Sequence, residues 1–137
     1  MTDELVLGCD VGSQGTNVAV YTAGGDLVAS AYEPYDVSFP APGWAEQDPA
    51  LWLAALRRAV QRVLEEPDVE PSAVKGMSFG SQLDGVVAVD RDGRALRPAL
   101  IWMDRRAEEQ ARRLAERIAE GFDTIRDGSG LKVVIRP

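Results

Sequence analysis

The chain has 137 residues, a net charge of −7, one cysteine and no histidine. The absence of histidine excludes imidazole general bases and histidine-ligated zinc, and the acidic composition disfavours nucleic acid and anionic membranes as partners. One cysteine allows no internal disulfide, and we find neither a secretory signal nor an apolar run of about 20 residues, so we expect a cytoplasmic protein of one domain.

Three strands are predicted near the start of the chain, over residues 5–11, 18–22 and 27–33. The turn between the last two contains Gly24 and Gly25, and glycine supplies at little cost the positive φ angles that a hairpin turn needs. We therefore expect an antiparallel three-stranded meander. Residues 34–48 are predicted as an irregular loop, because three prolines interrupt regular structure there.

A helix is predicted to begin at Asp48 and Pro49, with the aspartate as N-cap and the proline in the first turn. Glu65, Glu66 and Pro67 mark its end. Its apolar face repeats at spacings of four and three residues and consists of Trp52, Leu56, Ala59 and Val63.

The rest of the chain is predicted to form strands over 74–80, 84–90 and 98–103, with a tight turn at residues 90–93. A second amphipathic helix is expected over 105–119, ending at Gly121 as C-cap. Its buried stripe would be Ala107, Ala111, Leu114 and Ile118. This order of elements indicates an α/β fold with a mixed sheet.

The turn between the first two strands carries the strongest chemical signal. An apolar strand ends in Asp10, a turn with two glycines follows, and the chain returns directly into a second strand. Because no helix opens after the glycines, the Walker loop and the dinucleotide fingerprint are both excluded. What remains is a phosphate cradle built on a hairpin, as in the sugar-kinase, actin and heat-shock-chaperone ATPase fold.

Four segments resemble motifs of the FGGY carbohydrate kinases in order and spacing. They are residues 10–16 (DVGSQGT), 42–49 (PGWAEQDP), 80–85 (GSQLDG) and 97–106 (RPALIWMDRR). The resemblance is greatest to the pentulose kinases, of which xylulokinase is the familiar member. It implies a ribonuclease-H-like (actin-like ATPase) domain. Residues 1–137 would then be the N-terminal domain of the kinase, and we expect a truncated chain that lacks the family's C-terminal domain.

The resemblance also implies ATP and Mg²⁺ as cofactors and a sugar or polyol as substrate. Among these substrates it favours a pentulose such as xylulose. Asp10 would be the carboxylate that holds the metal ion. The ATP phosphates would meet Gly12, Ser13, Gln14, Gly15, Thr16 and Asn17. The sugar would meet Gln82, Leu83, Asp84, Trp102, Asp104 and Arg105. The catalytic base would come from the family's second domain, so we expect this chain alone to be inactive.

Two positions depart from the family pattern. Many relatives carry lysine or arginine where Asn17 stands, and xylulokinases usually show Met-His in place of Leu83 and Asp84. A structural role is the alternative for several site residues: Asp10 could bond to the turn's own amides, Trp102 could be a core residue, and Asp104 could cap a helix.

The sequence leaves alternatives to the kinase half open. One is a non-catalytic sugar- or nucleotide-binding module or a truncated remnant; another, an actin- or chaperone-like ATPase, would make the three sugar-side motifs a coincidence. Trp44, Glu46 and Gln47 are interpreted as structural, and Cys9 as a small buried hydrophobe. An apolar face without its cover would make the chain self-associate into a homo-oligomer or aggregate.

Overall fold

The computed structural model describes residues 4–126, without the side chains of 120–125. The chain divides after Asp104 into two compact units, which are described separately. Of the elements in residues 4–126, the first unit contains all of the strands, and the second contains one long helix.

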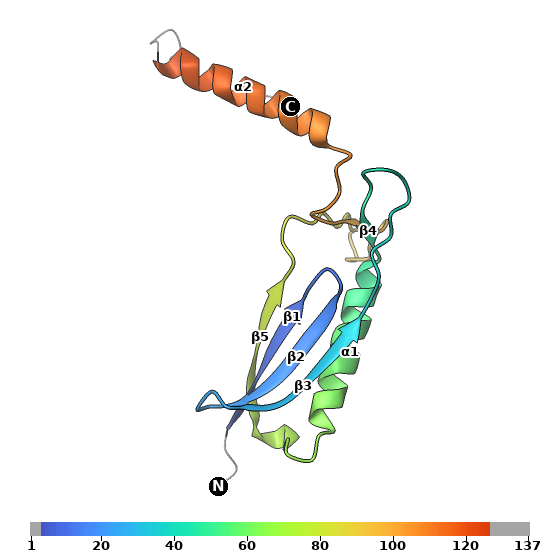
Figure 1. Ribbon diagram of the computed structural model, residues 1–137, viewed down its shortest axis with the longest axis vertical. Helices are drawn as coiled ribbons and strands as arrows, with labels where there is room; N and C mark the ends of the chain where they lie inside the picture. Colours follow the sequence, from blue (N-terminus) through green and yellow to red (C-terminus); the bar gives the residue numbers. More distant parts are fainter. Residues whose placement is uncertain (1–3, 127–137) are drawn as a thin grey trace. The chain divides into compact units, whose positions relative to one another are not determined.

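A four-stranded sheet in the order β3-β2-β1-β5 forms the centre of the first unit (Figure 1). β1 (Leu5–Val11), β2 (Gly15–Thr22) and β3 (Leu27–Pro34) pair with one another in antiparallel order, and β5 (Val74–Ser81) lies parallel to β1. The predicted meander and mixed sheet are confirmed. β2 begins three residues earlier than expected, because the turn before it is closed tightly by a bond from the Gly12 N–H to the Gly15 carbonyl.

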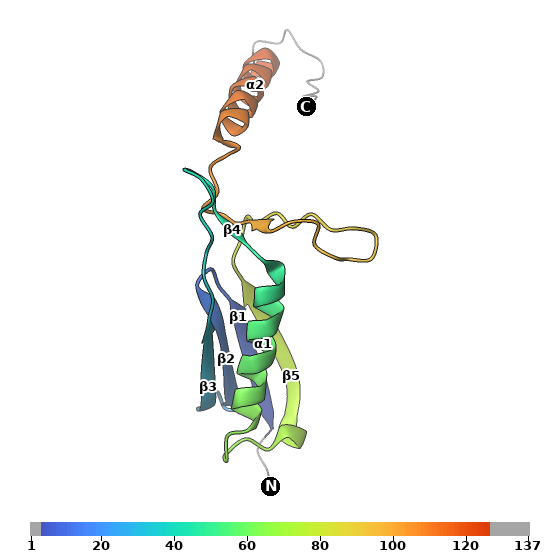
Figure 2. The ribbon, with the colours of Figure 1, turned by 90° about the vertical axis from the view of Figure 1, so that its right-hand side faces the viewer.

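The helix α1 (Pro49–Leu64) lies along one face of the sheet, mainly against β2 and β3 (Figure 2). The predicted cap is confirmed: the Asp48 carboxylate accepts a hydrogen bond from the Ala50 N–H at 2.9 Å. A core of small apolar side chains is buried between helix and sheet, comprising Leu5, Leu7, Cys9, Val18, Val20, Ala31, Ala59 and Val63. Burial raises the pKa of the Cys9 thiol, as expected of a small hydrophobe in the core.

The strand predicted over 84–90 is wrong. This segment makes isolated bridges, Val86 with Leu100 and Val89 with Ala95, and its large apolar side chains stay exposed. A ladder gains stability from burying one of its faces, and nothing in the first unit covers this segment. The strand expected over 98–103 shrinks to β6 (Ala99–Leu100), which pairs with β4 (Glu46–Gln47) inside the predicted loop.

The second unit is described by α2 (Glu108–Arg126) alone. The helix begins three residues later than predicted and continues through Gly121, so the proposed C-cap is wrong. Leu114 and Ile118 of the predicted buried stripe are exposed, because one helix has no core of its own. Neither α1 nor α2 has the length and apolarity that a membrane crossing requires, within residues 4–126.

Candidate functional site

The two predicted ligand turns meet at one end of the sheet. Val11 at the end of β1 is the parallel neighbour of Ser81 at the end of β5, and the Gln82 N–H donates to the Val11 carbonyl at 2.9 Å. The carboxyl ends of neighbouring parallel strands open onto the same edge, where ligands of α/β sheets bind. The fold therefore brings the glycine turn and the 82–84 turn together, as the resemblance implied.

A hollow of about 440 Å³ lies between these turns, outside the sheet edge. Residues from three separate segments of the first unit line it, namely Asp10, Gly12, Ser13, Ser81, Gln82, Leu83, Asp84 and Trp102. Seven of these eight were singled out from the sequence, and Ser81 was not. The hollow offers two carboxylates, three polar side chains and an indole to a small polar ligand.

Side chains from outside the turn hold its three successive carbonyls. The Tyr35 hydroxyl donates to the Gly12 carbonyl at 2.6 Å, the Gln47 amide to the Ser13 carbonyl at 2.7 Å, and the Tyr32 hydroxyl to the Gln14 carbonyl at 2.9 Å. Burial raises the pKa of Tyr35, so its hydroxyl keeps the proton that it donates.

These bonds orient the turn's amide groups. A trans peptide is planar, so the N–H of each following residue points away from the side chain that holds the carbonyl. Among the described residues, the N–H groups of Ser13 and Gln14 donate no bond elsewhere. Adjacent N–H groups aimed in this way form an anion-binding concavity.

Gly15 is required by the close approach of an aromatic ring. A Cβ added there would lie 2.5 Å from ring atoms of Tyr32, closer than atoms can pack. Gly12 is less restricted, since its added Cβ would meet the Gly15 carbonyl oxygen at 3.3 Å. The second glycine of the turn therefore makes room for the tyrosine that holds the Gln14 carbonyl.

Four predicted phosphate-side residues lie outside the hollow, Gly15 and three residues with side chains. Thr16 is completely buried, and its hydroxyl donates to the Tyr35 hydroxyl at 3.4 Å. Asn17 is exposed and lies directly opposite Asp10 across the β1–β2 ladder, so both side chains leave the same face of the sheet. Gln14 is exposed and contributes through its backbone.

On the substrate side, Asp84 has an unusual backbone. Its φ of 57° lies in the left-handed region, which aspartate tolerates better than most residues. Constrained residues of this kind gather at ligand sites, where the surrounding structure fixes them. Leu83 is 75% exposed beside it, and Gln82 is half-buried and hydrogen-bonded on both ends of its amide.

Trp102 and Asp104 have different roles in the structure. The Trp102 indole N–H donates to the Ser13 hydroxyl at 2.8 Å, and half of the side chain stays exposed at the hollow. Asp104 accepts from the Ala45 N–H at 2.8 Å and caps no helix, because α2 begins at Glu108. Asp104 does not line the hollow, and Arg105 belongs to the second unit.

Sequence reasoning missed the residues that hold the glycine turn in shape. Tyr32, Tyr35 and Gln47 come from β3, the loop after it and β4. Gln47 was interpreted as part of a loop closure, and the two tyrosines carried no motif. Tyr35 and Gln47 do stand out as polar residues in or beside the proline-rich loop, and a polar side chain that is buried needs partners.

The residues of the hollow fit a magnesium ion shared with phosphates. Mg²⁺ is held in such sites by one or two carboxylates, water and substrate phosphates, so no dense cluster of ligands is required. Asp10 and Asp84 line the same hollow as the turn, and residues 4–126 contain no group of three or more histidine, cysteine, aspartate or glutamate side chains arranged for a metal.

Comparison with known proteins agrees with this geometry. The profile of the FGGY family of carbohydrate kinases, N-terminal domain, matches residues 5–134, and the chain belongs to this family. It is 32% identical over 130 residues to a xylulose kinase of Staphylococcus epidermidis, which covers 93% of the chain and 26% of that kinase. It is 34% identical over 129 residues to a glycerol kinase of Aromatoleum aromaticum, with shares of 93% and 26%.

Among solved structures, a xylulose-type kinase of Brucella ovis aligns with a TM-score of 0.81 and 34% identity, over 85% of this chain and 24% of that one. The mixed sheet with its flanking helix is thus the actin-like ATPase fold of the FGGY sugar kinases. The chain spans about a quarter of the length of the relatives that it matches.

Proposed function

We propose that this chain supplies the phosphate-side and sugar-side contacts of an ATP-dependent carbohydrate kinase, which transfers the γ-phosphoryl group of ATP to a hydroxyl of a sugar or polyol. The observation that carries the proposal is the single hollow shared by Asp10, the glycine turn, the 82–84 turn and Trp102. Family membership supports ATP as the phosphoryl donor. An ATP-dependent reaction and an unpaired buried thiol both suit the cytoplasm.

On the phosphate side, the N–H groups of Ser13 and Gln14 would donate to phosphate oxygens, because the carbonyls of the same two peptide groups, those of Gly12 and Ser13, are held in the opposite direction. Asp10 would hold Mg²⁺. The ion, when bound, neutralises charge on the phosphates. Catalysis of phosphoryl transfer depends mostly on such positioning and charge stabilisation.

On the sugar side, the Asp84 carboxylate can accept bonds from two neighbouring hydroxyls, and the Trp102 indole offers an apolar face to the C–H side of a sugar. Gln82 is held between Ser13 and Gln47 and would orient the sugar beside them. We favour a pentulose such as xylulose, since xylulose kinases recur among the relatives. Smaller polyols such as glycerol are the alternative, because Leu83 departs from the xylulokinase pattern and glycerol kinases are also among the relatives.

The base that takes the proton from the attacking hydroxyl is proposed to lie outside these 137 residues. Asp10 and Asp84 are the carboxylates that line the hollow among the described residues, and both have binding roles. The matched relatives are about four times as long as the segment they share with the chain. We therefore propose that the family's second domain is the partner that completes the site.

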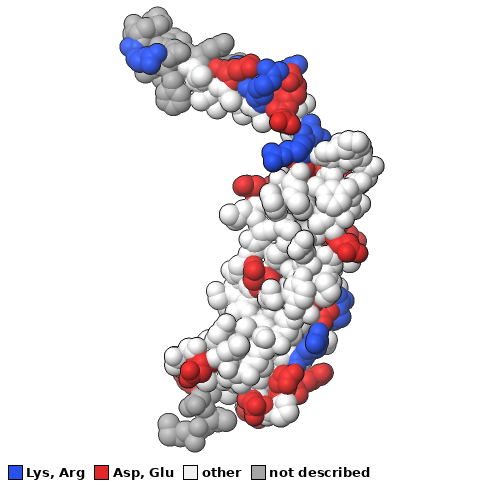
Figure 3. All heavy atoms as spheres, in the orientation of Figure 1, with Lys and Arg blue, Asp and Glu red and all other residues white. Residues whose placement is uncertain are grey.

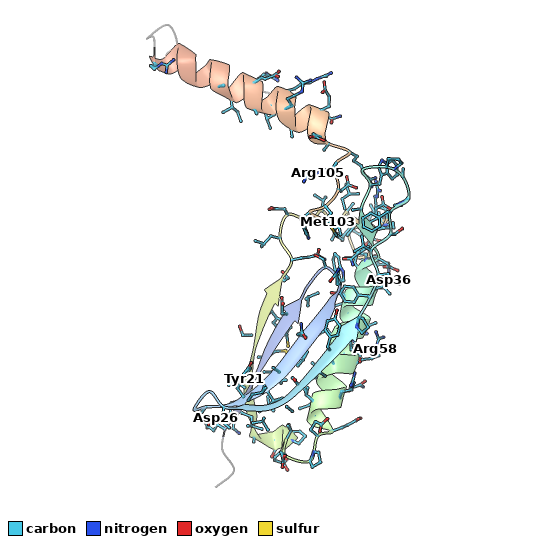
Figure 4. All side chains as sticks on the ribbon, viewed as in Figure 1. Tyr21, Asp26, Asp36, Arg58, Met103 and Arg105 are labelled. Carbon is cyan, nitrogen blue, oxygen red and sulfur yellow. The ribbon has the colours of Figure 1, made fainter. Side chains whose placement is uncertain are left out.

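The test uses the purified chain with D-xylulose, glycerol and Mg·ATP. We expect a rise in melting temperature with one of the sugars, because ligand binding to the folded state stabilises it. Asp84→Ala should abolish the rise. Asp26→Ala is the matched control, since Asp26 lies in the hairpin at the opposite end of the sheet (Figure 4). An unchanged rise in Asp84→Ala would contradict the sugar site.

A coupled assay on the same samples tests the missing base. We expect no sugar-dependent ADP release from the chain alone. Sugar-dependent release would place the base within residues 1–137. A second candidate, a non-catalytic sugar- or nucleotide-binding module, is favoured by the exposed Asn17, which stands where many relatives carry a lysine or arginine beside the phosphates. This candidate would be supported if the chain still bound ligand after the family's second domain was added and no turnover followed.

A further inference from the structure

Gln47 is a polar side chain in the core of the site, and the 42–49 motif that contains it indicates only a structural role. It belongs to the two-residue strand β4, and its side chain is 2% exposed. It does not line the hollow. A buried amide is costly unless it is hydrogen-bonded, so its partners indicate what the residue does.

The Gln47 amide uses all four of its hydrogen-bonding positions. Its nitrogen donates to the Ser13 carbonyl at 2.7 Å and to the Asp36 carbonyl at 3.2 Å. Its oxygen accepts from the Trp52 indole at 3.1 Å and from the Gln82 amide at 3.0 Å. Reversing the amide would set donors against donors and acceptors against acceptors, so its orientation is fixed by the partners.

These bonds close a ring between the two ligand turns. Gln47 donates to the Ser13 carbonyl, the Ser13 hydroxyl donates to the Gln82 side-chain oxygen at 3.1 Å, and the Gln82 nitrogen donates back to Gln47. Trp102 joins the ring through the Ser13 hydroxyl. The phosphate-side turn and the sugar-side turn thus share one hydrogen-bond network whose buried member is Gln47.

We propose that Gln47 is a positioning residue that couples the two half-sites. It holds the Ser13 carbonyl, which turns the Gln14 N–H outward, and the same amide orients Gln82 beside the sugar. A phosphate group bound at the turn then strengthens the ring on the sugar side, and the effect is reciprocal. The inference rests on the proposed phosphate site at the glycine turn.

The structure provides a reporter for this coupling. The Trp52 indole donates to Gln47 from α1, and Trp52 does not line the hollow. In a ¹⁵N-labelled sample of the whole chain titrated with Mg·ATP, the backbone amides of Ser13 and Gln14 should shift by direct contact. The Trp52 indole signal should shift with the same midpoint, because it senses Gln47.

Variants then separate the roles of the amide. Gln47→Leu should weaken Mg·ATP binding about tenfold, the order expected for losing one buried hydrogen bond that fixes the turn. Gln47→Glu keeps an oxygen for Trp52 and Gln82 but no donor for the Ser13 carbonyl, so it should also weaken binding while the Trp52 signal no longer follows Mg·ATP. Gln61→Leu, an exposed glutamine on α1, is the control and should bind as the native chain does.

The outcomes distinguish the two levels of the proposal. If no amide of the native chain responds to Mg·ATP, the phosphate site itself fails and the coupling fails with it. If Ser13 and Gln14 respond but the Trp52 indole does not, the phosphate site stands and the coupling is overturned. If Gln47→Leu does not fold, this native titration still decides. Native affinity in folded Gln47→Leu would also overturn the positioning role.

Discussion

β1 and β5 are parallel neighbours in one sheet, yet their side chains have opposite environments. On the face toward α1, Leu7 and Cys9 of β1 are buried at 4% exposure, whereas their register partners Met77 and Phe79 on β5 are 44% and 59% exposed. The helix packs mainly on β2 and β3 rather than on β5. Burial of a strand is therefore decided by what covers it, and not by its own apolar content.

The uncovered side forms an apolar groove of about 630 Å³. Its walls come from α1, β5 and the segments around residues 83–87 and 101, and include Trp52, Leu53, Leu56, Phe79, Val87 and Ile101. Figure 3 shows another face of the first unit, where the strands lie in front and few charged side chains cover them. Exposed apolar patches of this kind favour association in water.

The largest expected effect on stability is in the part of the sheet that α1 covers. Leu7→Ala should lower the free energy of unfolding by about 2–4 kcal/mol, because it removes buried methyl groups and leaves a cavity. Phe79→Ala removes more carbon atoms but should cost well under half as much, because its ring is already in water. Urea denaturation of both variants checks the pair. Equal losses would show that β5 is covered in solution.

The next effect concerns the ligand edge. Gly15→Ala should destabilise the chain by about 1–3 kcal/mol, because the added methyl group meets the Tyr32 ring. Adding Tyr32→Ala should recover part of this loss by making room. A double-mutant cycle in urea measures the coupling between the two residues. Strictly additive losses would mean that the ring does not pack against Gly15.

The exposed β5 edge of the sheet should also determine whether the chain self-associates. We propose that the isolated chain forms oligomers through the groove beside β5, and that Phe79→Lys shifts it toward monomer, since charged side chains protect sheet edges. Leu27→Lys is the control, being equally exposed at 59% but on the opposite edge strand. Light scattering at several concentrations reports the masses. A native chain that is monomeric throughout would contradict this proposal.

The smallest effect belongs to an ion-pair cluster between α1 and β3. The Glu33 carboxylate contacts Arg58 at 2.8 Å and Arg62 at 2.9 Å, and their hydrogen bonds lower the pKa of Glu33 below its ordinary 4.5. The stabilisation is complete above pH 4.5 and is lost as the pH falls through the lower, folded-state pKa.

Glu33→Gln should therefore be less stable than the native chain at pH 7, with a gap that closes at acid pH. Thermal melts between pH 7 and pH 3 measure the gap. Asp68→Asn, an exposed carboxylate for which no ion pair is found among the described residues, is the control. A gap that widens toward acid would reverse the sign of the argument.

Much of the part of the sheet that α1 covers could be predicted from sequence, because the local sequence signals there agree with the tertiary packing. The glycine hairpin, the Asp48 cap and the apolar face ending in Val63 all lie where they were expected. The 84–90 segment has a strand-like pattern but lacks a partner and cover, so the pattern alone gave the wrong result. Gly121 was wrong as a cap, because α2 continues past it as a helix to Arg126.

The candidate site shows the same limit. Motif spacing identified the lining of the hollow, including Asp10, Ser13, Asp84 and Trp102. It could not identify Tyr32, Tyr35 and Gln47, because their partners are backbone carbonyls up to 34 positions away in sequence and a carbonyl leaves no mark on residue type. Thr16 and Asp104 match the family motifs, but their side chains form hydrogen bonds to other groups of the protein.

The most direct test of the site is a crystal structure of the chain grown with Mg·ATP and D-xylulose. The account predicts phosphate oxygens against the N–H groups of Ser13 and Gln14, and the sugar against Asp84 and Trp102 in the same hollow. Nucleotide or sugar bound in the apolar groove beside Phe79, with the hollow left without ligand, would contradict it.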